Sequence, residues 1–255
     1  MLYHSWITSK VIAHRGLYTE GIPENSLSAF LNAAKNGYTI ELDVQITSDG
    51  EIVVFHDYNA LRMTGHDLEI NKTKFEQLKN LRLNGSDEKI PLLKEVFNAV
   101  DGKVPVLIET KNEGRAGMLE QKLCSLLMDY RGDYAVMSFN PFSLAAVKKC
   151  MPRAARGQIS SDFIGEKMPW YEKFILRNML LNFISKPGFI AYDISGLPNK
   201  RVARLRAEGV PVLGWTIRSM EELERAAQYC DNIIFAGIEH CQTVWDEIRR
   251  THFAA

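Results

Sequence analysis

The sequence of 255 residues lacks most of the features that mark specialised protein classes. Its four cysteines (Cys124, Cys150, Cys230 and Cys241) form no CxxC pair, which argues against a disulfide framework or a zinc site and favours free thiols in a reducing compartment. The formal net charge is zero, because 31 Lys and Arg balance 31 Asp and Glu. This balance argues against a protein that binds nucleic acid over its whole surface. Neither a secretory signal nor an apolar run of about 18 residues is present. We therefore expect a cytoplasmic protein.

The chain also lacks internal repeats and any linker rich in Gly, Ser or Pro, so we expect residues 1–255 to form a single domain. Short β-branched runs alternate with stretches whose apolar residues have helical spacing. This alternation is typical of a parallel sheet, either open or closed. The candidate strands are residues 11–13, 39–46, 52–55, 104–108, 134–137, 157–160, 189–194, 210–217 and 232–235.

A closed barrel of this kind needs eight strands, so one of the nine candidates is extra. The excess lies at residues 39–46 and 52–55, which only Thr47-Ser48-Asp49-Gly50 separates. The Asp-Gly pair is a strong signal for a tight turn, so a hairpin is one interpretation. The other is two adjacent barrel strands without a helix between them, and the sequence alone leaves both open.

Acidic side chains stand at two of the predicted strand ends, where parallel α/β folds place their ligand sites. Glu41 and Asp43 are two residues apart, so both point to one face of the strand, roughly 6.6 Å apart along it. Glu109 adds a carboxylate from another strand, and such an oxygen set suits Mg²⁺ or Ca²⁺. The alternative is a structural ion network with Arg15 and Lys111, and the residues alone leave both interpretations open.

Two histidines, His14 and His56, each end a β-branched run and are predicted to face the same mouth. A pair of imidazoles can supply both an acid and a base near neutral pH. Arg15 and Lys111 would add positive charge that suits a tetrahedral anion, above all phosphate. Together with a hard divalent ion, these groups point to phosphodiester cleavage.

A series of short motifs between residues 11 and 220 carries these side chains. They are His14-Arg15-Gly16, Glu24-Asn25, Glu41-Leu42-Asp43-Val44, Val54-Phe55-His56-Asp57, Leu61-Arg62-Met63-Thr64-Gly65, Glu109-Thr110-Lys111, Ser138-Phe139 and Trp215-Thr216. In type and order they resemble the motifs of the glycerophosphodiester phosphodiesterases, which belong to the phospholipase-C-like phosphodiesterases. The resemblance implies an α/β fold, a TIM (β/α)8 barrel, with a small insertion at about residues 57–92, after the second or third strand.

The resemblance also implies hydrolysis of a small-molecule glycerophosphodiester to sn-glycerol 3-phosphate and an alcohol. It assigns His14 and His56 as the acid/base pair, and Glu41, Asp43 and Glu109 as ligands of a divalent metal, Mg²⁺ or Ca²⁺. It further assigns Arg15 and Lys111 to the phosphate and Trp215 to the glycerol carbons. Attack by a neighbouring glycerol hydroxyl, through a cyclic intermediate, and direct attack by water both remain open.

Residues 161–188 are longer and more aromatic than a minimal barrel loop. We expect a helix packed over the barrel. The alternative is an amphipathic patch that admits lipid tails or contacts a membrane surface, which would point to lysophospholipids. Two other functions are considered: a lipid phosphodiesterase of the same superfamily, lysophospholipase D-like or phosphoinositide-cleaving, and a catalytically silent barrel that only binds phosphorylated ligands. The complete set of histidines and carboxylates argues against the silent barrel.

Overall fold

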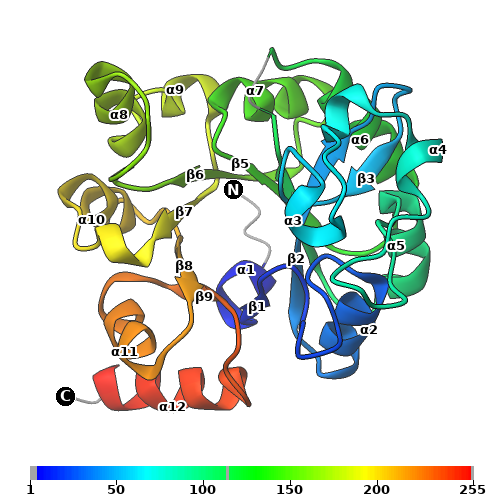
Figure 1. Ribbon diagram of the computed structural model, residues 1–255. Helices are drawn as coiled ribbons and strands as arrows, with labels where there is room; N and C mark the ends of the chain where they lie inside the picture. The colour runs from blue at the N-terminus through cyan, green and yellow to red at the C-terminus, as the bar shows by residue number, and fades with distance from the viewer. Residues whose placement is uncertain (1–4, 113–114, 254–255) are drawn as a thin grey trace.

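The computed structural model describes residues 5–112 and 115–253, which form a closed barrel surrounded by helices (Figure 1). The strands are β1 (Ile12–Ala13), β2 (Thr39–Ile46), β3 (Ile52–Val54), β4 (Val106–Thr110), β5 (Tyr134–Ser138), β6 (Ala155–Ser160), β7 (Phe189–Asp193), β8 (Val212–Ile217) and β9 (Asn232–Phe235). They follow the order β1-β9-β8-β7-β6-β5-β4-β2-β3, and β1 also pairs with β2, which closes the sheet. All pairings except that of β2 with β3 are parallel, so the predicted TIM barrel is confirmed.

Helices connect the strands and form the outer layer. The α-helices are α1 (Trp6–Ser9), α2 (Leu27–Lys35), α3 (Leu61–Thr64), α4 (Phe75–Leu78), α5 (Leu93–Val100), α6 (Met118–Asp129), α7 (Pro141–Cys150), α8 (Trp170–Arg177), α9 (Asn182–Ser185), α10 (Lys200–Ala207), α11 (Met220–Tyr229) and α12 (Cys241–Phe253), and the 3₁₀ helices are η1 (Ile70–Lys72) and η2 (Ile194–Gly196). Several begin where a side chain accepts a hydrogen bond from a free backbone N–H of the first turn, at Ser26, Asn140, Asn199 and Ser219. Within the described residues, no helix combines the length and the apolar character needed to cross a bilayer.

The pairing of β3 with β2 is antiparallel, so of the two alternatives that the sequence left open for this part of the chain the structure has the hairpin. Residues Ile40–Val44 of β2 pair with β4, whereas Val44–Ile46 pair with β3. The hairpin therefore continues past the barrel rim and returns the chain towards it. Its far strand ends where the N–H of Phe55 donates to the carbonyl of Asp43 at 3.0 Å. This return brings His56, the next residue, back to the mouth of the barrel.

Some strand ends differ from the predicted ones by one or two residues, and proline explains two of these differences. Strands β4 and β8 begin two residues later than expected, directly after Pro105 and Pro211. A proline has no N–H to donate to a sheet, although the carbonyls of Pro105 and Pro211 accept from Ile40 and Ile190 at 3.0 and 2.8 Å. Strand β7 ends at Asp193, because its side chain accepts from the N–H of Ser195 and starts η2.

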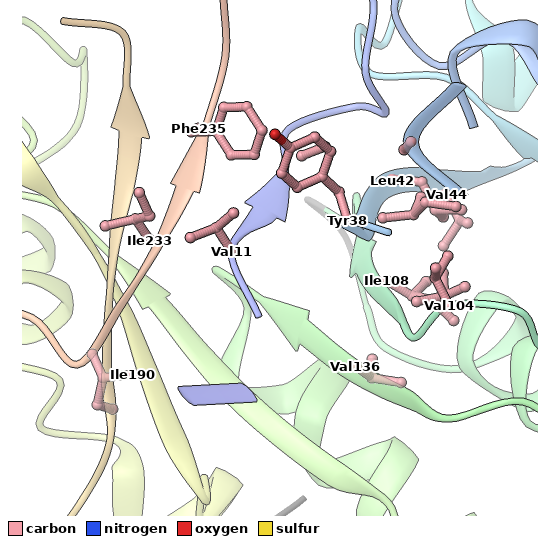
Figure 2. Close-up of a cluster of buried hydrophobic side chains, with 14 of the residues drawn as sticks. Val11, Tyr38, Leu42, Val44, Val104, Ile108, Val136, Ile190, Ile233 and Phe235 are labelled. Atoms are coloured by element: carbon pink, nitrogen blue, oxygen red, sulfur yellow. The ribbon is translucent and has the colours of Figure 1, made fainter. Parts of the chain in front are cut away.

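The apolar core has an outer and an inner part. The outer part lies between the strands and the helices, and Figure 2 shows Leu42, Ile108 and Val136 in it. The inner part fills the barrel and includes Trp6 and Ile7 from α1, which lies in the middle of the ring in Figure 1. A separate small core under α3, η1 and α4 holds the insertion, residues 57–92, against β3. The apolar interior therefore leaves the carboxyl end of the barrel for polar side chains.

Candidate active site

Three carboxylates meet inside the barrel, as the alternation of side chains along β2 predicts. Glu41 and Asp43 point inward from β2, and Asp43 lies beside Glu109 of β4 in the strand register. All three are buried, and one carboxylate oxygen from each lies within 4.8 Å of the others. Such a cluster is costly to bury without compensating positive charge.

The pKa values follow from this crowding. Burial, followed by the charges of Asp43 and Glu109, raises the pKa of Glu41 well above its ordinary value. Burial also raises the pKa of Glu109, although Lys111 opposes the shift. At Asp43 burial acts in the same direction, but Lys111 and Arg15 outweigh it, and the pKa falls to about 2. Of the three carboxyl groups, Glu41 is thus the one whose negative charge is least compensated by neighbouring positive side chains.

The contacts of these carboxylates fit both alternatives given in the sequence analysis, a structural ion network and a site for a divalent metal. The Nζ of Lys111 lies 2.8 Å from Glu109 Oε1 and 3.6 Å from Asp43 Oδ1, and the Nε of Arg15 lies 3.4 Å from Asp43 Oδ2, so an ion network exists. It does not include the side chain of Glu41 among the described residues. Glu41 Oε2 accepts from the backbone N–H of Arg15 at 2.7 Å, but Oε1 is buried without a hydrogen-bond partner in the described part of the chain. Three hard oxygen donors, one of them unpartnered, fit a divalent cation.

The loop after β1 brings His14 and Arg15 to this cluster, and Gly16 makes its tight path possible. Gly16 has φ +79°, and a Cβ there would lie 2.9 Å from backbone and side-chain atoms of Ala29 in α2. Burial, with a further contribution from the positive charge of Arg15, lowers the pKa of His14 to about 3. The imidazole of His14 is therefore neutral near pH 7 and can accept a proton.

The second histidine is fixed by its sequence neighbour. His56 Nδ1 lies 2.6 Å from Asp57 Oδ1. Hydrogen bonds and charge from Arg62 lower the pKa of Asp57 although burial opposes the shift, so its ionised carboxylate accepts a hydrogen bond from His56. Arg62 in turn bonds Glu24 Oε1 at 2.6 Å, and Glu24 accepts from Arg15 Nη1 at 2.7 Å. An ion-pair chain thus links the two histidine loops.

The predicted site residues come together at one cavity of about 290 Å³. Its lining includes His14, Arg15, Glu41, His56, Glu109, Lys111 and Trp215. Asp43 is absent from this lining but completes the carboxylate cluster. The ring of Trp215 packs edge-on against Phe139, with centroids 5.6 Å apart.

A second cavity, of about 1260 Å³, adjoins the first and shares six lining residues with it: Glu109, Lys111, Phe139, Asp193, Ser195 and Trp215. Away from the shared residues its lining is mixed: Phe163, Ile175 and Leu176 contribute apolar surface, and Asp162 and Glu172 contribute acidic groups. The two cavities give room for a ligand that has a phosphate end and a bulky end.

The residue-by-residue prediction assigned no role to several side chains that hold the site together. Asn25 Nδ2 donates to Asp43 Oδ2 at 2.9 Å, and Arg218 lines the smaller cavity and helps to lower the pKa of His14. Glu24, Asp57 and Arg62 form the ion-pair chain described above. Except for Arg218, these residues belong to the motifs given in the sequence analysis, so those motifs could have pointed to them. The only sequence feature that could have pointed to Arg218 is its position directly after a strand.

A closed parallel barrel with carboxylates, histidines and cations at one cavity defines the class of TIM-barrel hydrolases that act on phosphate esters. The model of the glycerophosphoryl diester phosphodiesterase family matches residues 14–235. The chain therefore belongs to the glycerophosphoryl diester phosphodiesterase family and is an enzyme that hydrolyses glycerophosphodiesters.

Individual relatives agree with this assignment. The chain is 32% identical over 235 residues to the glycerophosphodiester phosphodiesterase of Caldanaerobacter subterraneus, covering 84% of this chain and 88% of the relative. It is 34% identical over 155 residues to the human lysophospholipase D GDPD1, covering 56% of this chain and 48% of that protein. A phosphodiesterase of Oleispira antarctica, solved with its product sn-glycerol 3-phosphate, superposes with a TM-score of 0.76 at 25% identity and 98% and 99% coverage of the two chains. The silent-barrel alternative is thus not supported.

Proposed function

We propose that this enzyme cleaves glycerophosphodiesters to sn-glycerol 3-phosphate and an alcohol in a metal-dependent reaction with His14 and His56 as the acid/base pair. The observation that carries the proposal is the single cavity lined by both histidines, both cations and two of the three clustered carboxylates. The product bound in the Oleispira antarctica phosphodiesterase supports the glycerol phosphate part of the assignment. The free cysteines support a cytoplasmic, reducing location.

In this proposal Glu41, Asp43 and Glu109 hold Mg²⁺ or Ca²⁺, as their hard oxygen donors suit. When bound, the ion supplies positive charge that stabilises the developing negative charge on the phosphoryl oxygens. Arg15 and Lys111 line the same cavity and place two further positive charges beside the phosphate. Trp215 offers an apolar ring face to the glycerol carbons.

The two histidines have different surroundings, which supports different roles. His14 is neutral and buried, so it accepts the proton of the attacking hydroxyl, either of water or of the neighbouring glycerol carbon. The Nδ1 of His56 is hydrogen-bonded to the Asp57 carboxylate, which orients the ring and leaves its other nitrogen for the substrate. In this proposal that nitrogen donates a proton to the leaving alkoxide.

Release of sn-glycerol 3-phosphate from glycerophosphocholine tests these roles. We expect His14→Ala and His56→Ala each to lower kcat by roughly 10²–10⁴ while the circular dichroism spectrum is unchanged. Chelation of divalent ions should abolish turnover, and Mg²⁺ or Ca²⁺ should restore it. Full activity of a Glu41→Ala/Asp43→Ala variant in the presence of chelator would refute the metal role.

A second candidate function is hydrolysis of acylated glycerophosphodiesters, that is, a lysophospholipase D-like activity. The apolar part of the larger cavity's lining favours it, because Phe163, Ile175 and Leu176 offer an acyl chain a contact surface. The relative named lysophospholipase D matches part of this chain. Turnover of lysophosphatidylcholine and of glycerophosphocholine should be compared, and Leu176→Asp should weaken only the first. Equal loss for both substrates would exclude this function.

A further inference from the structure

The segment of residues 161–188 packs on the barrel in part, through buried Phe163 and Met179, and in part presents apolar side chains to solvent. None of the residues of α8, Trp170–Arg177, all of which the structure describes, is buried. Ile164 is 84% exposed, Trp170 79% and Phe183 71%. Figure 1 shows α8 and α9 at the periphery of the molecule, across the barrel from α3, α4 and α5. The expected helix therefore exists and contacts the barrel through one side, where Ser160 of β6 donates to the carbonyl of Leu176 at 2.8 Å, while its other side is left exposed.

The two sides of α8 differ. Trp170 and Phe174 are four residues apart, so they share one side of the helix, and both are exposed. Ile175 and Leu176, on the other side, are half-buried and line the larger cavity. Helix α8 thus separates the larger cavity from solvent. Ile164 both lines the cavity and is exposed, so the cavity opens beside the aromatic surface.

The charges of this segment are also separated. All three of its acidic residues, Asp162, Glu166 and Glu172, line the larger cavity. Its basic residues, Lys167, Lys173, Arg177 and Lys186, are absent from that lining. The acids thus line the cavity, whereas Lys173, three residues after Trp170, shares the outer side of α8 with it, and Lys167 and Lys186 are exposed. Arg177 instead contacts the phenol of Tyr192 in β7. The outer surface combines exposed aromatic rings with lysines.

From this arrangement we propose that the outer surface of residues 161–188 docks on an anionic lipid bilayer. Aromatic rings with one apolar body and one polar edge prefer the headgroup level of a bilayer, and neighbouring lysines attract acidic headgroups. A second copy of the chain fits less well, because a two-fold contact through this surface would bring its own lysines towards each other. The proposal goes beyond the hydrolytic reaction, since binding requires no turnover. Docking would place the mouth of the larger cavity at the lipid surface.

Cosedimentation with vesicles tests the proposal on the full chain. We expect binding to vesicles that contain phosphatidylglycerol and much weaker binding to pure phosphatidylcholine, with the difference lost at high salt. Trp170→Ser/Phe174→Ser should lower the partition constant by about tenfold or more, since each ring loses its apolar contact with lipid. The matched control is Met118→Ser/Met128→Ser, which removes two equally exposed apolar side chains from α6 and should bind as wild type. Lys167→Glu/Lys173→Glu should remove the preference for phosphatidylglycerol.

Tryptophan fluorescence gives a second readout. Trp6 and Trp245 are buried, whereas Trp170 is the most exposed of the large apolar side chains of α8. Vesicles should shift the emission of the wild type to shorter wavelength, and Trp170→Phe should lose the shift while still sedimenting with vesicles. All variants should hydrolyse glycerophosphocholine in solution at the wild-type rate, which shows that they fold. Unchanged vesicle binding of Trp170→Ser/Phe174→Ser would overturn the proposal. A dimer that these substitutions dissociate, with no vesicle binding by the wild type, would overturn it as well.

Discussion

The Glu41 carboxyl allows the metal hypothesis to be tested through stability as well as activity. At an effective dielectric constant of about 20, two unit charges 4.8 Å apart repel by about 3.5 kcal/mol. Glu41 has two such neighbours, Asp43 and Glu109, and the protein relieves part of the repulsion by raising the pKa of Glu41. We therefore expect Glu41→Gln to increase the free energy of unfolding of the chelated protein by about 1–3 kcal/mol at neutral pH.

The sign of the pH dependence follows from the raised pKa. The neutral Glu41 carboxyl is tolerated below the ordinary pKa of a glutamate, and this contribution to stability is lost as pH rises through the raised pKa of the folded state. The advantage of Glu41→Gln should therefore grow between these two pKa values. Urea denaturation at a series of pH values, in chelator, measures it.

Glu41→Gln should also lose the stabilisation and the activity that bound metal gives the wild type. At a metal concentration about 100 times Kd, the wild type should gain about 2.7 kcal/mol of stability, and Glu41→Gln should gain far less and lose activity. Glu120→Gln is the matched control, because Glu120 is equally buried but accepts hydrogen bonds from Gly117, Asn112 and Ser143. Its replacement should destabilise the protein by about 1–3 kcal/mol with or without metal. If Glu41→Gln behaved like this control, the carboxylate cluster would not be the metal site.

Three further changes test the supporting structure. Asp57→Asn should lower kcat by about tenfold or more, because His56 loses the carboxylate that accepts a hydrogen bond from Nδ1 and orients its ring; a wild-type kcat would contradict this role. Arg62→Gln should move acid unfolding to higher pH, since the contribution of ionised Glu24, whose pKa Arg62 lowers against the effect of burial, is lost as pH falls through that lowered pKa; circular dichroism during acid titration measures the midpoint. Gly16→Ala should destabilise the chain by more than about 1 kcal/mol in denaturant unfolding, because its positive φ and close approach to α2 leave no room for a methyl group.

The barrel and the core of the site could be predicted because they depend on short-range rules. Alternation along one strand is enough to place Glu41 and Asp43 on one face, and parallel pairing then aligns Asp43 with Glu109. The position of His56 is different. Its approach depends on the antiparallel return of β3, which the Asp-Gly turn favours but does not require.

Contacts between distant loops could not be read from the sequence. The hydrogen bond between Arg62 and Glu24 joins residues 38 positions apart, and no sequence pattern around either residue indicates that they are in contact. The outward side of α8 is a further example. Aromatic residues in a helix usually indicate burial, so their spacing alone favoured a packed helix, whereas the barrel here supplies no surface to cover Trp170 and Phe174.

The buried carboxylates that serve the site also destabilise the barrel interior. The distribution of apolar side chains shows how the fold tolerates these buried charges. The inner core, which includes Trp6 and Leu107, fills the barrel up to the carboxylates, and its members Met137, Ile159 and Ile234 line the site cavity beside them. The buried charge thus interrupts one end of the core and leaves the packing of the strands against the helices intact. A cation held there as proposed would relieve the repulsion within the cluster, so the free energy that the crowded charges cost would be recovered as binding free energy. A barrel with a neutral interior would be more stable without metal, but it would lack this source of affinity at the point where the phosphate must be held.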